Sequence, residues 1–256
     1  HFETLEQLFP GHPRTIEAAL SHSELLQRQQ RLAEARAVIE RLPRRSLTAI
    51  QRDHVELRLG SLDVIDGQAE AARARFLSVK DAKETALRQA AFNGLGDAAL
   101  FLGDDQEAED WYRQAEAIDP GCPAGAYAIY QQGRLLLKAG RRQEAMERFR
   151  ALTTHPLQTP DRLLMLNARL ALALSYLVSG EPDTAREELR GAAQEAPDSR
   201  QAARIDYYLA LLALHDGQLE DAKRLARNVG QRAADSDEAF EAQLLLADLS
   251  AGEGSF

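Results

Sequence analysis

The sequence is short of several residue types that would signal particular functions. It contains one cysteine, Cys122, so neither an internal disulfide nor a cysteine-based zinc site can form. Only four lysines are present and the formal net charge is −9, which argues against a general surface for nucleic acid or anionic lipid. No HExxH motif, histidine–cysteine cluster or nucleophile–base spacing occurs. We therefore expect no metal, no cofactor and no catalysis in this chain.

Long uninterrupted apolar runs are also missing. The most apolar stretch, from Leu163 to Val178, is broken by Asn167, Arg169 and Ser175, which favours a buried helix over a bilayer span. Aromatic residues make up only 6% of the chain, and Ala, Leu, Arg, Glu and Gln dominate. These are strong helix formers, so the composition predicts an all-α protein with no direct membrane insertion.

A glycine recurs along the chain at intervals of 36, 37, 40, 37 and 37 residues. The six glycines are Gly67, Gly103, Gly140, Gly180, Gly217 and Gly254. An alanine follows five residues after each of the first five: Ala72, Ala108, Ala145, Ala185 and Ala222. A weaker earlier copy has Gln30 in place of the glycine. Apolar and small residues at helical spacing on both sides predict two helices per unit, joined by a turn that contains the glycine.

The spacing Gly94-x-Gly96-x-x-Ala99 matches a loop that could cradle a pyrophosphate. It falls inside a predicted helix, however, with no strand before it and no acidic residue on a second strand after it, and a dinucleotide fingerprint requires both. Other units carry Gly or Ala where Gly96 stands. We therefore predict that these glycines allow close helix packing.

The pattern resembles the tetratricopeptide repeat, of the bacterial multi-repeat scaffold type. The copy from Gln89 to Cys122 matches it at Leu95-Gly96, Gly103-Asp104, Ala108, Tyr112, Ala115 and Asp119-Pro120. The resemblance implies an all-α, right-handed superhelical solenoid of antiparallel helix pairs, with about six full repeats and partial repeats at both ends.

We predict a single solenoid over residues 1–256. The expected repeats span 16–52, 53–88, 89–125, 126–165, 166–202 and 203–239, with a truncated repeat at 240–256 and the end of a preceding repeat at 1–13. The repeats run longer than the usual 34 residues, and we place the largest insertion at 155–160.

The resemblance also implies a binding surface on the first helix of each pair, on the side that faces away from its partner helix and lines the concave groove. The predicted groove residues are Tyr127, Tyr130, Gln131, Arg134, Asn167, Leu170, Arg204, Tyr207, Tyr208 and Leu211. The same positions in other helices include Leu57, Arg58, Ser61, Asn93, Asp97 and Leu174. Tyrosine suits a binding surface because it has a large apolar face and a polar tip. The alternative is that some of these tyrosines fill gaps between units.

Three smaller features have structural interpretations. Asp104 lies at a predicted helix start, and Asp235 with Glu238 has the spacing of a capping box. Trp111 is expected to pack between units, with an exposed contact as the alternative.

The sequence thus predicts a non-enzymatic scaffold that binds a peptide or a partner helix, within a larger bacterial protein of envelope assembly or polysaccharide export. The alternatives are a sensing domain of a large cytoplasmic transcription regulator and a substrate-selecting region of an enzyme. We favour the periplasm over the cytoplasm, and leave the partner's identity and the oligomeric state open.

Overall fold

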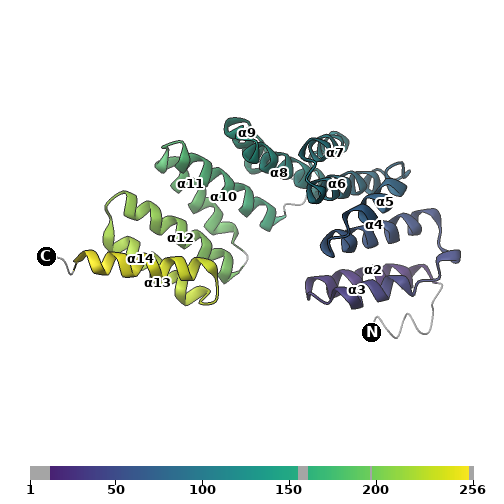
Figure 1. The fold of residues 1–256 in the computed structure, drawn as a ribbon, viewed down its shortest axis with the longest axis horizontal. Coiled ribbons are helices and arrows are strands. Elements are labelled where there is room, and N and C mark those ends of the chain that lie inside the picture. Colours follow the sequence, from purple (N-terminus) through teal and green to yellow (C-terminus); the bar gives the residue numbers. More distant parts are fainter. Residues whose placement is uncertain (1–11, 155–160, 197, 254–256) are drawn as a thin grey trace. The chain divides into compact units, whose positions relative to one another are not determined.

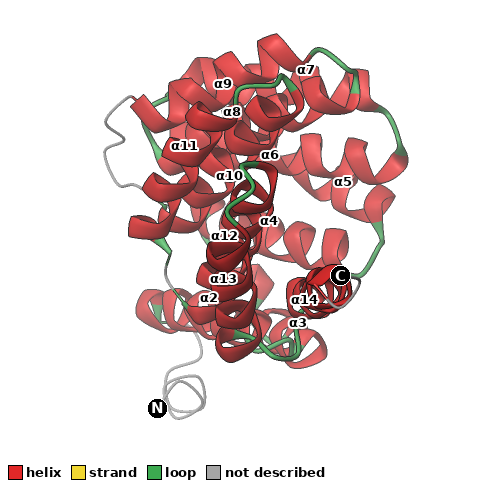
Figure 2. Ribbon diagram, turned by 90° about the vertical axis from the view of Figure 1, so that its left-hand side faces the viewer, coloured by secondary structure: helices red, strands yellow, loops and turns green. Residues whose placement is uncertain are grey.

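The computed structural model describes residues 12–154, 161–196 and 198–253. In that part of the chain the regular structure is entirely helical, with loops between the helices and no strand (Figures 1 and 2). A short 3-10 helix, η1, spans Arg44–Ser46. The α-helices are α2 (Pro13–Arg28), α3 (Leu32–Glu40), α4 (Ala49–Ile65), α5 (Ala69–Val79), α6 (Thr85–Leu102), α7 (Asp105–Ile118), α8 (Pro123–Lys138), α9 (Arg142–Thr154), α10 (Arg162–Val178), α11 (Pro182–Glu195), α12 (Ser199–His215), α13 (Leu219–Arg232) and α14 (Asp237–Glu253). The predicted all-α fold is confirmed.

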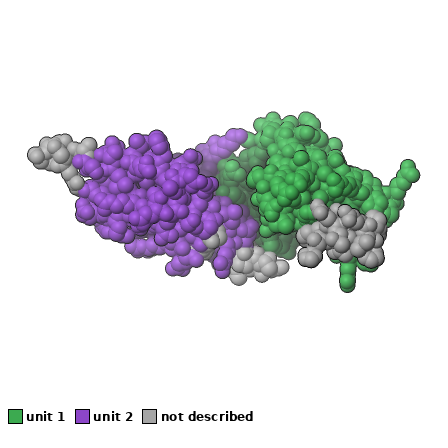
Figure 3. Space-filling view, turned by 90° about the horizontal axis from the view of Figure 1, so that it is seen from below, with its two compact units in different colours: residues 1–135 green, residues 136–256 purple. Residues whose placement is uncertain are grey.

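The chain divides into two compact units, unit 1 with residues 1–135 and unit 2 with residues 136–256 (Figure 3). In unit 1, α2 packs on α3, α4 on α5 and α6 on α7, and α4 also contacts α6. In unit 2, α10 packs on α11 and α12 on α13, and α14 contacts both members of the latter pair. Tight turns reverse the chain within each pair, which gives the predicted antiparallel helix pairs. We call the even-numbered helices the first helices and the odd-numbered ones the second helices.

The recurring glycines take the left-handed conformation at the end of each first helix. Five of them have φ between 73° and 83°. Each glycine N–H donates to the carbonyl three residues back at 3.0–3.1 Å, and the next N–H donates to the carbonyl five residues before it at 2.7–2.9 Å. This is the Schellman motif, whose left-handed position favours glycine because a Cβ would be strained there. Gln30 forms the same turn with φ 62°, although it carries a side chain. Gly254 lies outside the described residues.

The glycines inside the helices make room for aromatic rings. A Cβ added to Gly94 would lie 2.5 Å from the ring of Phe76, and one added to Gly96 would lie 2.5 Å from the ring of Tyr112. A Cβ added to Gly60 would also meet the Phe76 ring, at 2.6 Å. The predicted packing role of Gly94 and Gly96 is therefore confirmed. The alanines that follow the turns are fully buried: Ala72, Ala108, Ala145, Ala185 and Ala222.

Ion pairs link several second helices to the next helix pair, a feature that the repeat pattern did not predict. In each case an arginine directly after the repeat alanine reaches an acidic residue 30 or 34 positions later. The pairs are Arg36–Asp66 and Arg73–Glu107 in unit 1, both at 2.7 Å, and Arg186–Asp216 in unit 2. They are partly exposed, so each contributes about 0–1 kcal/mol to stability and mainly fixes the register between successive pairs.

Two of the local predictions are confirmed and one is wrong. Asp104 caps α7 by accepting from the Glu107 N–H at 2.9 Å. Trp111 packs on the core of the preceding helix pair and stacks on Phe92 with the ring centroids 5.6 Å apart. The cap of α14 is Ser236, whose Oγ accepts from the Ala239 N–H at 3.1 Å, and not Asp235. Ser236 caps the helix because α14 begins at Asp237, one residue later than the capping-box spacing of Asp235 and Glu238 requires.

The predicted terminal segment, insertion and repeat boundaries stay predictions. Most of the segment 1–13, expected to end a preceding repeat, lies outside the described residues, as does the expected insertion at 155–160. The repeat boundaries between them are not defined by the division into two units.

Candidate functional site

The first-helix surface of unit 1 is organised around the carboxylate of Asp97 on α6. One oxygen, Oδ1, accepts hydrogen bonds from the Tyr112 hydroxyl at 2.6 Å and from the Tyr127 hydroxyl at 2.7 Å. Gln131 Nε2 donates to the Tyr127 oxygen at 2.6 Å, and Arg134 donates to Gln131 Oε1 at 2.9 Å. The network thus joins α6, α7 and α8.

Burial raises the pKa of Asp97 above its usual value, while the tyrosine hydroxyls and the Gln131 amide oppose that rise by stabilising the anion. Burial, together with the charge of Asp97, raises the pKa of both Tyr112 and Tyr127. Both tyrosines therefore stay protonated at neutral pH and serve as donors.

This network contains three of the predicted groove residues, Tyr127, Gln131 and Arg134. The Tyr127 hydroxyl donates to Asp97, and Gln131 is only 6% exposed. Tyr130 is half-buried and Arg134 is exposed, so these two side chains supply the accessible part of the predicted surface in unit 1. The neighbouring Asn93 is also structural, since its Nδ2 donates to the Ala124 carbonyl at the start of α8 at 2.8 Å.

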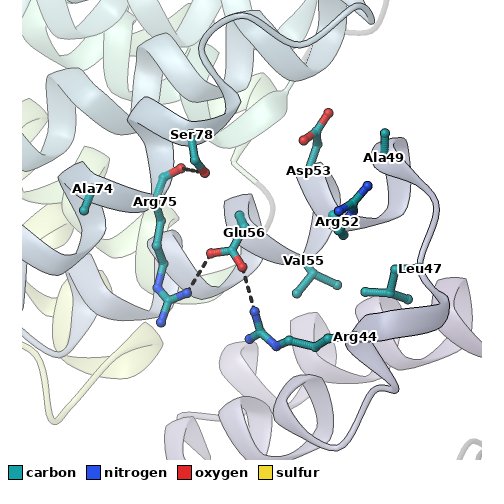
Figure 4. A pocket seen from close by; sticks show the side chains of 10 residues that line it. All are labelled: Arg44, Leu47, Ala49, Arg52, Asp53, Val55, Glu56, Ala74, Arg75 and Ser78. Carbon is teal, nitrogen blue, oxygen red and sulfur yellow. Dashed lines mark hydrogen bonds and ion pairs between the residues drawn. The ribbon is translucent and has the colours of Figure 1, made fainter.

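A pocket of about 530 Å³ lies between η1, α4 and α5 in unit 1 (Figure 4). Its wall is an ion-pair network, because Glu56 accepts from Arg44 and from Arg75, both at 2.7 Å. Arg75 also pairs with Asp63, a carboxylate only 1% exposed, at 2.7 Å. The opposite charges compensate each other within the wall, so the arrangement supports a structural role. The lining residues are Arg44, Leu47, Ala49, Arg52, Asp53, Val55, Glu56, Ala74, Arg75 and Ser78.

The first-helix surface of unit 2 has a different character. Tyr207 and Tyr208 on α12 are half-buried, with ring centroids 5.6 Å apart and ring planes tilted by 56°. Arg204 and Leu211, one turn to either side on the same helix, are also partly exposed. Among the described residues, neither the Tyr207 nor the Tyr208 hydroxyl makes a hydrogen bond, so both remain available to a partner.

The next first helix, α14, extends this surface. The repeat spacing of 37 residues places Glu241 and Leu244 at the positions that Arg204 and Tyr207 hold on α12. Leu244 is 48% exposed. We define the unit 2 face as Arg204, Tyr207, Tyr208, Leu211, Glu241 and Leu244.

The two predicted residues on α10 differ from each other. Asn167 is half-buried and keeps a partly accessible side chain. Leu170 is 2% exposed, so it belongs to the core and offers no surface to a partner. The periodicity placed Leu170 on the outward side of its helix, but the neighbouring helices cover that side at this level.

Charged groups gather beside the unit 2 face. A pocket of about 260 Å³ at the N-terminal turns of α12 and α14 is lined by Asp235, Asp237, Glu238, Arg200 and Arg204, with Gln201 and Ser236. The ion pairs across it are long, 3.4 Å for Arg200–Asp235 and 3.8 Å for Arg204–Glu238. The acidic side chains therefore remain only partly compensated.

Metal binding and membrane spanning are the other two possibilities for the described residues. No group of three or more His, Cys, Asp or Glu side chains in this part of the chain is arranged to ligand a metal ion. Of the helices in the described ranges, none has both the length and the apolar character needed to cross a bilayer.

Comparison with solved structures finds the same fold in several proteins. The chain is similar to a Signal Transduction ATPase with Numerous Domains from Pyrococcus horikoshii, a protein that has a tetratricopeptide repeat sensor. The TM-score is 0.71 and the identity 15%, over 95% of this chain and 40% of that one. It is similar to a chain of the APC/C hetero-tetramer Cut9-Hcn1, with a TM-score of 0.70 and 14% identity over 97% of this chain and 45% of that one. The quorum sensor NprR from B. thuringiensis, in its apo form, gives a TM-score of 0.68 and 13% identity over 91% of this chain and 69% of that one.

This chain thus spans less than half the length of the first two. At these identities the likeness shows the fold alone. No curated protein matches the sequence.

A family model is more specific. The model described as "Tetratricopeptide repeat" matches residues 57–123, 130–200 and 170–227, which together make up well over half of the chain. The matched segments contain the left-handed glycine turns and the buried alanines described above. The chain belongs to the tetratricopeptide repeat family.

Proposed function

We propose that this protein is a non-catalytic scaffold that binds a peptide or a helix of a partner protein on its first-helix surfaces, chiefly on the unit 2 face. The family is suited to protein–protein interaction because stacked helix pairs present a preformed surface, which costs little ordering free energy on binding.

The observation that carries the proposal is the Tyr207–Tyr208 pair. Two tyrosines in contact, half-buried and one turn from Leu211, form an apolar platform with unused hydroxyl groups, and the exposed Leu244 holds the position of Tyr207 on the next first helix. Tyrosine is enriched among the residues that dominate binding energy, because it buries a large area at a small cost in side-chain entropy. Tyr130 and Arg134 of unit 1 form a second, smaller contact surface in this proposal.

Three biological settings fit such a scaffold. One is a bacterial periplasmic protein of envelope assembly or polysaccharide export. A second is the sensing domain of a cytoplasmic regulator. The similarity in fold to a quorum sensor and to a protein with a tetratricopeptide repeat sensor supports this setting. A repeat region that selects substrates for an enzyme is a third setting. The identity of the captured partner distinguishes the three.

A pull-down from a bacterial lysate tests the proposal. The bait is the chain itself, compared with Tyr207→Ala/Tyr208→Ala and with a control variant, Phe101→Ala/Val178→Ala, which removes two side chains that are 58% and 66% exposed elsewhere. Circular dichroism establishes that all three are folded. We expect a partner that the wild type and the control retain and the tyrosine variant loses. A partner retained by all three would refute the unit 2 face as the binding site.

A further inference from the structure

The unit 2 face carries a charge pattern that indicates the chemistry of its partner. Glu238 on α14 lies 3.8 Å from Arg204, which is one turn before Tyr207 on α12. Burial, and then the charges of Glu241, Tyr208 and Glu238, raise the pKa of the Tyr207 hydroxyl. Tyr207 packs on the core shared by α12, α13 and α14, so its position relative to these carboxylates is held by the helix packing. The aromatic platform therefore borders directly on negative charge.

The adjoining pocket adds to this negative charge. It contributes the carboxylates of Asp235, Asp237 and Glu238, against the guanidinium groups of Arg200 and Arg204. Counting Glu241, four acidic groups face two basic ones. Because Ser236 caps α14, Asp235 is not needed for the cap. Asp235 is instead 85% exposed and 3.4 Å from Arg200, a separation at which an exposed ion pair contributes little.

We infer that the unit 2 face binds a peptide segment that combines a large apolar side chain with a nearby lysine or arginine. The apolar side chain packs on Tyr207, Tyr208 and Leu244, and the cation points toward Glu238 and Glu241. This inference rests on the proposed function and specifies its ligand. A cation over a tyrosine ring beside carboxylates gains from both the ring quadrupole and the opposite charge. An acidic segment would meet net repulsion at the same place.

A selection from random peptides tests the inference without assuming a sequence. Phage-displayed random 12-residue peptides are panned on the immobilised full chain, with Tyr207→Ala/Tyr208→Ala as the counter-selection. We expect the enriched peptides to carry net positive charge and at least one Leu, Ile, Met or Phe. One enriched peptide is then synthesised with a fluorescent label, and its affinity is measured by anisotropy.

Two matched variants test the role of charge. Glu238→Gln/Glu241→Gln removes two negative charges beside the platform, whereas Glu220→Gln/Asp221→Asn removes two exposed negative charges on the second helix α13. We expect the first to weaken binding of the synthetic peptide about two- to tenfold, and the second to leave it unchanged. Raising the salt concentration should weaken binding to the wild type and should have less effect on the Glu238→Gln/Glu241→Gln variant.

The outcomes separate this inference from the proposed function. Enriched peptides that are acidic or uncharged, yet depend on the two tyrosines, would overturn the inference and leave the scaffold proposal standing. Basic peptides that bind both glutamate-to-glutamine and control variants equally would also overturn it. If no peptide is enriched over uncoated beads, the proposed binding function of the unit 2 face itself fails.

Discussion

The two units use tyrosines on their first helices in opposite ways. In unit 1, Tyr127 donates to Asp97 on the preceding first helix and is thereby part of the internal packing. In unit 2, Tyr207 and Tyr208 contact each other and border the surface. Asp97 lies six residues before its turn glycine, and the same position on α10 is Leu174. A leucine offers no acceptor, and Arg204 on α12 stands where Tyr127 stands on α8, 13 residues before the turn glycine. The position of a tyrosine on its own helix, together with the side chain that the preceding first helix offers, therefore decides whether it stabilises the fold or borders the surface.

The sharpest test of this comparison removes the acceptor in unit 1. Asp97→Ala deprives the fully buried Tyr112 and the half-buried Tyr127 of their common acceptor, and each unsatisfied hydroxyl costs about 1–3 kcal/mol. Since the variant also relieves the burial of a charge, we expect a net loss of about 2–4 kcal/mol in urea unfolding. Leu174→Ala in unit 2 leaves no polar group unsatisfied and should cost less. Equal losses would mean that the Asp97 network is not a stabilising feature.

A second test compares glycines that differ in their surroundings. Gly96→Ala would place a methyl group 2.5 Å from the Tyr112 ring, so we expect overpacking to cost about 1–3 kcal/mol. Gly230 in α13 has no atom within 4 Å of an added Cβ, so Gly230→Ala in unit 2 should stabilise the protein by about 0.5–1 kcal/mol through helix propensity. Thermal unfolding followed by circular dichroism measures both. A neutral Gly96→Ala would contradict the close crossing of α6 and α7.

The turns allow a similar comparison. Gln30 in unit 1 holds a left-handed φ of 62°, whereas the matching turn residue in unit 2, Gly217, has φ 73° and no Cβ. We expect Gln30→Gly to stabilise the chain by up to about 1 kcal/mol, because the relief of backbone strain exceeds the extra entropy of glycine in the unfolded state. Gly217→Ala should destabilise by a similar amount. Differential scanning calorimetry of the two variants would reveal the opposite signs, and a loss of stability in Gln30→Gly would show that the strain is absent.

The smallest expected effect is a dependence on pH. Burial raises the folded-state pKa of Asp97 above its unfolded value, so protonation favours the folded state. The associated stability is fully present below the unfolded pKa and is lost as the pH rises through the folded pKa. The unfolding free energy of the wild type, measured against Asp97→Asn in urea from acidic to neutral pH, should therefore fall relative to the variant as the pH rises. A rise would show that the hydrogen bonds outweigh burial.

Much of the fold could be predicted because its causes are local. The left-handed turn at Gly103 needs a residue without Cβ, and the crossing at Gly96 needs a residue without a side chain, so both leave a periodic trace in the sequence. The candidate site was less predictable. Leu170 and Gln131 have the spacing of surface residues, yet both are buried, because the covering side chains come from other helices.

By itself, the sequence determined the helix pairs, the position of the turns and the family, since these depend on spacing along one chain segment. The tertiary structure alone decided which tyrosine hydroxyls find an acceptor, which arginines link successive repeats, and where carboxylates border an aromatic platform. Those properties depend on distances of a few ångströms between side chains that lie about 30 residues apart, as in Tyr127–Asp97 and Arg36–Asp66. A hydrogen bond or a close ion pair forms only when packing brings both partners into that range.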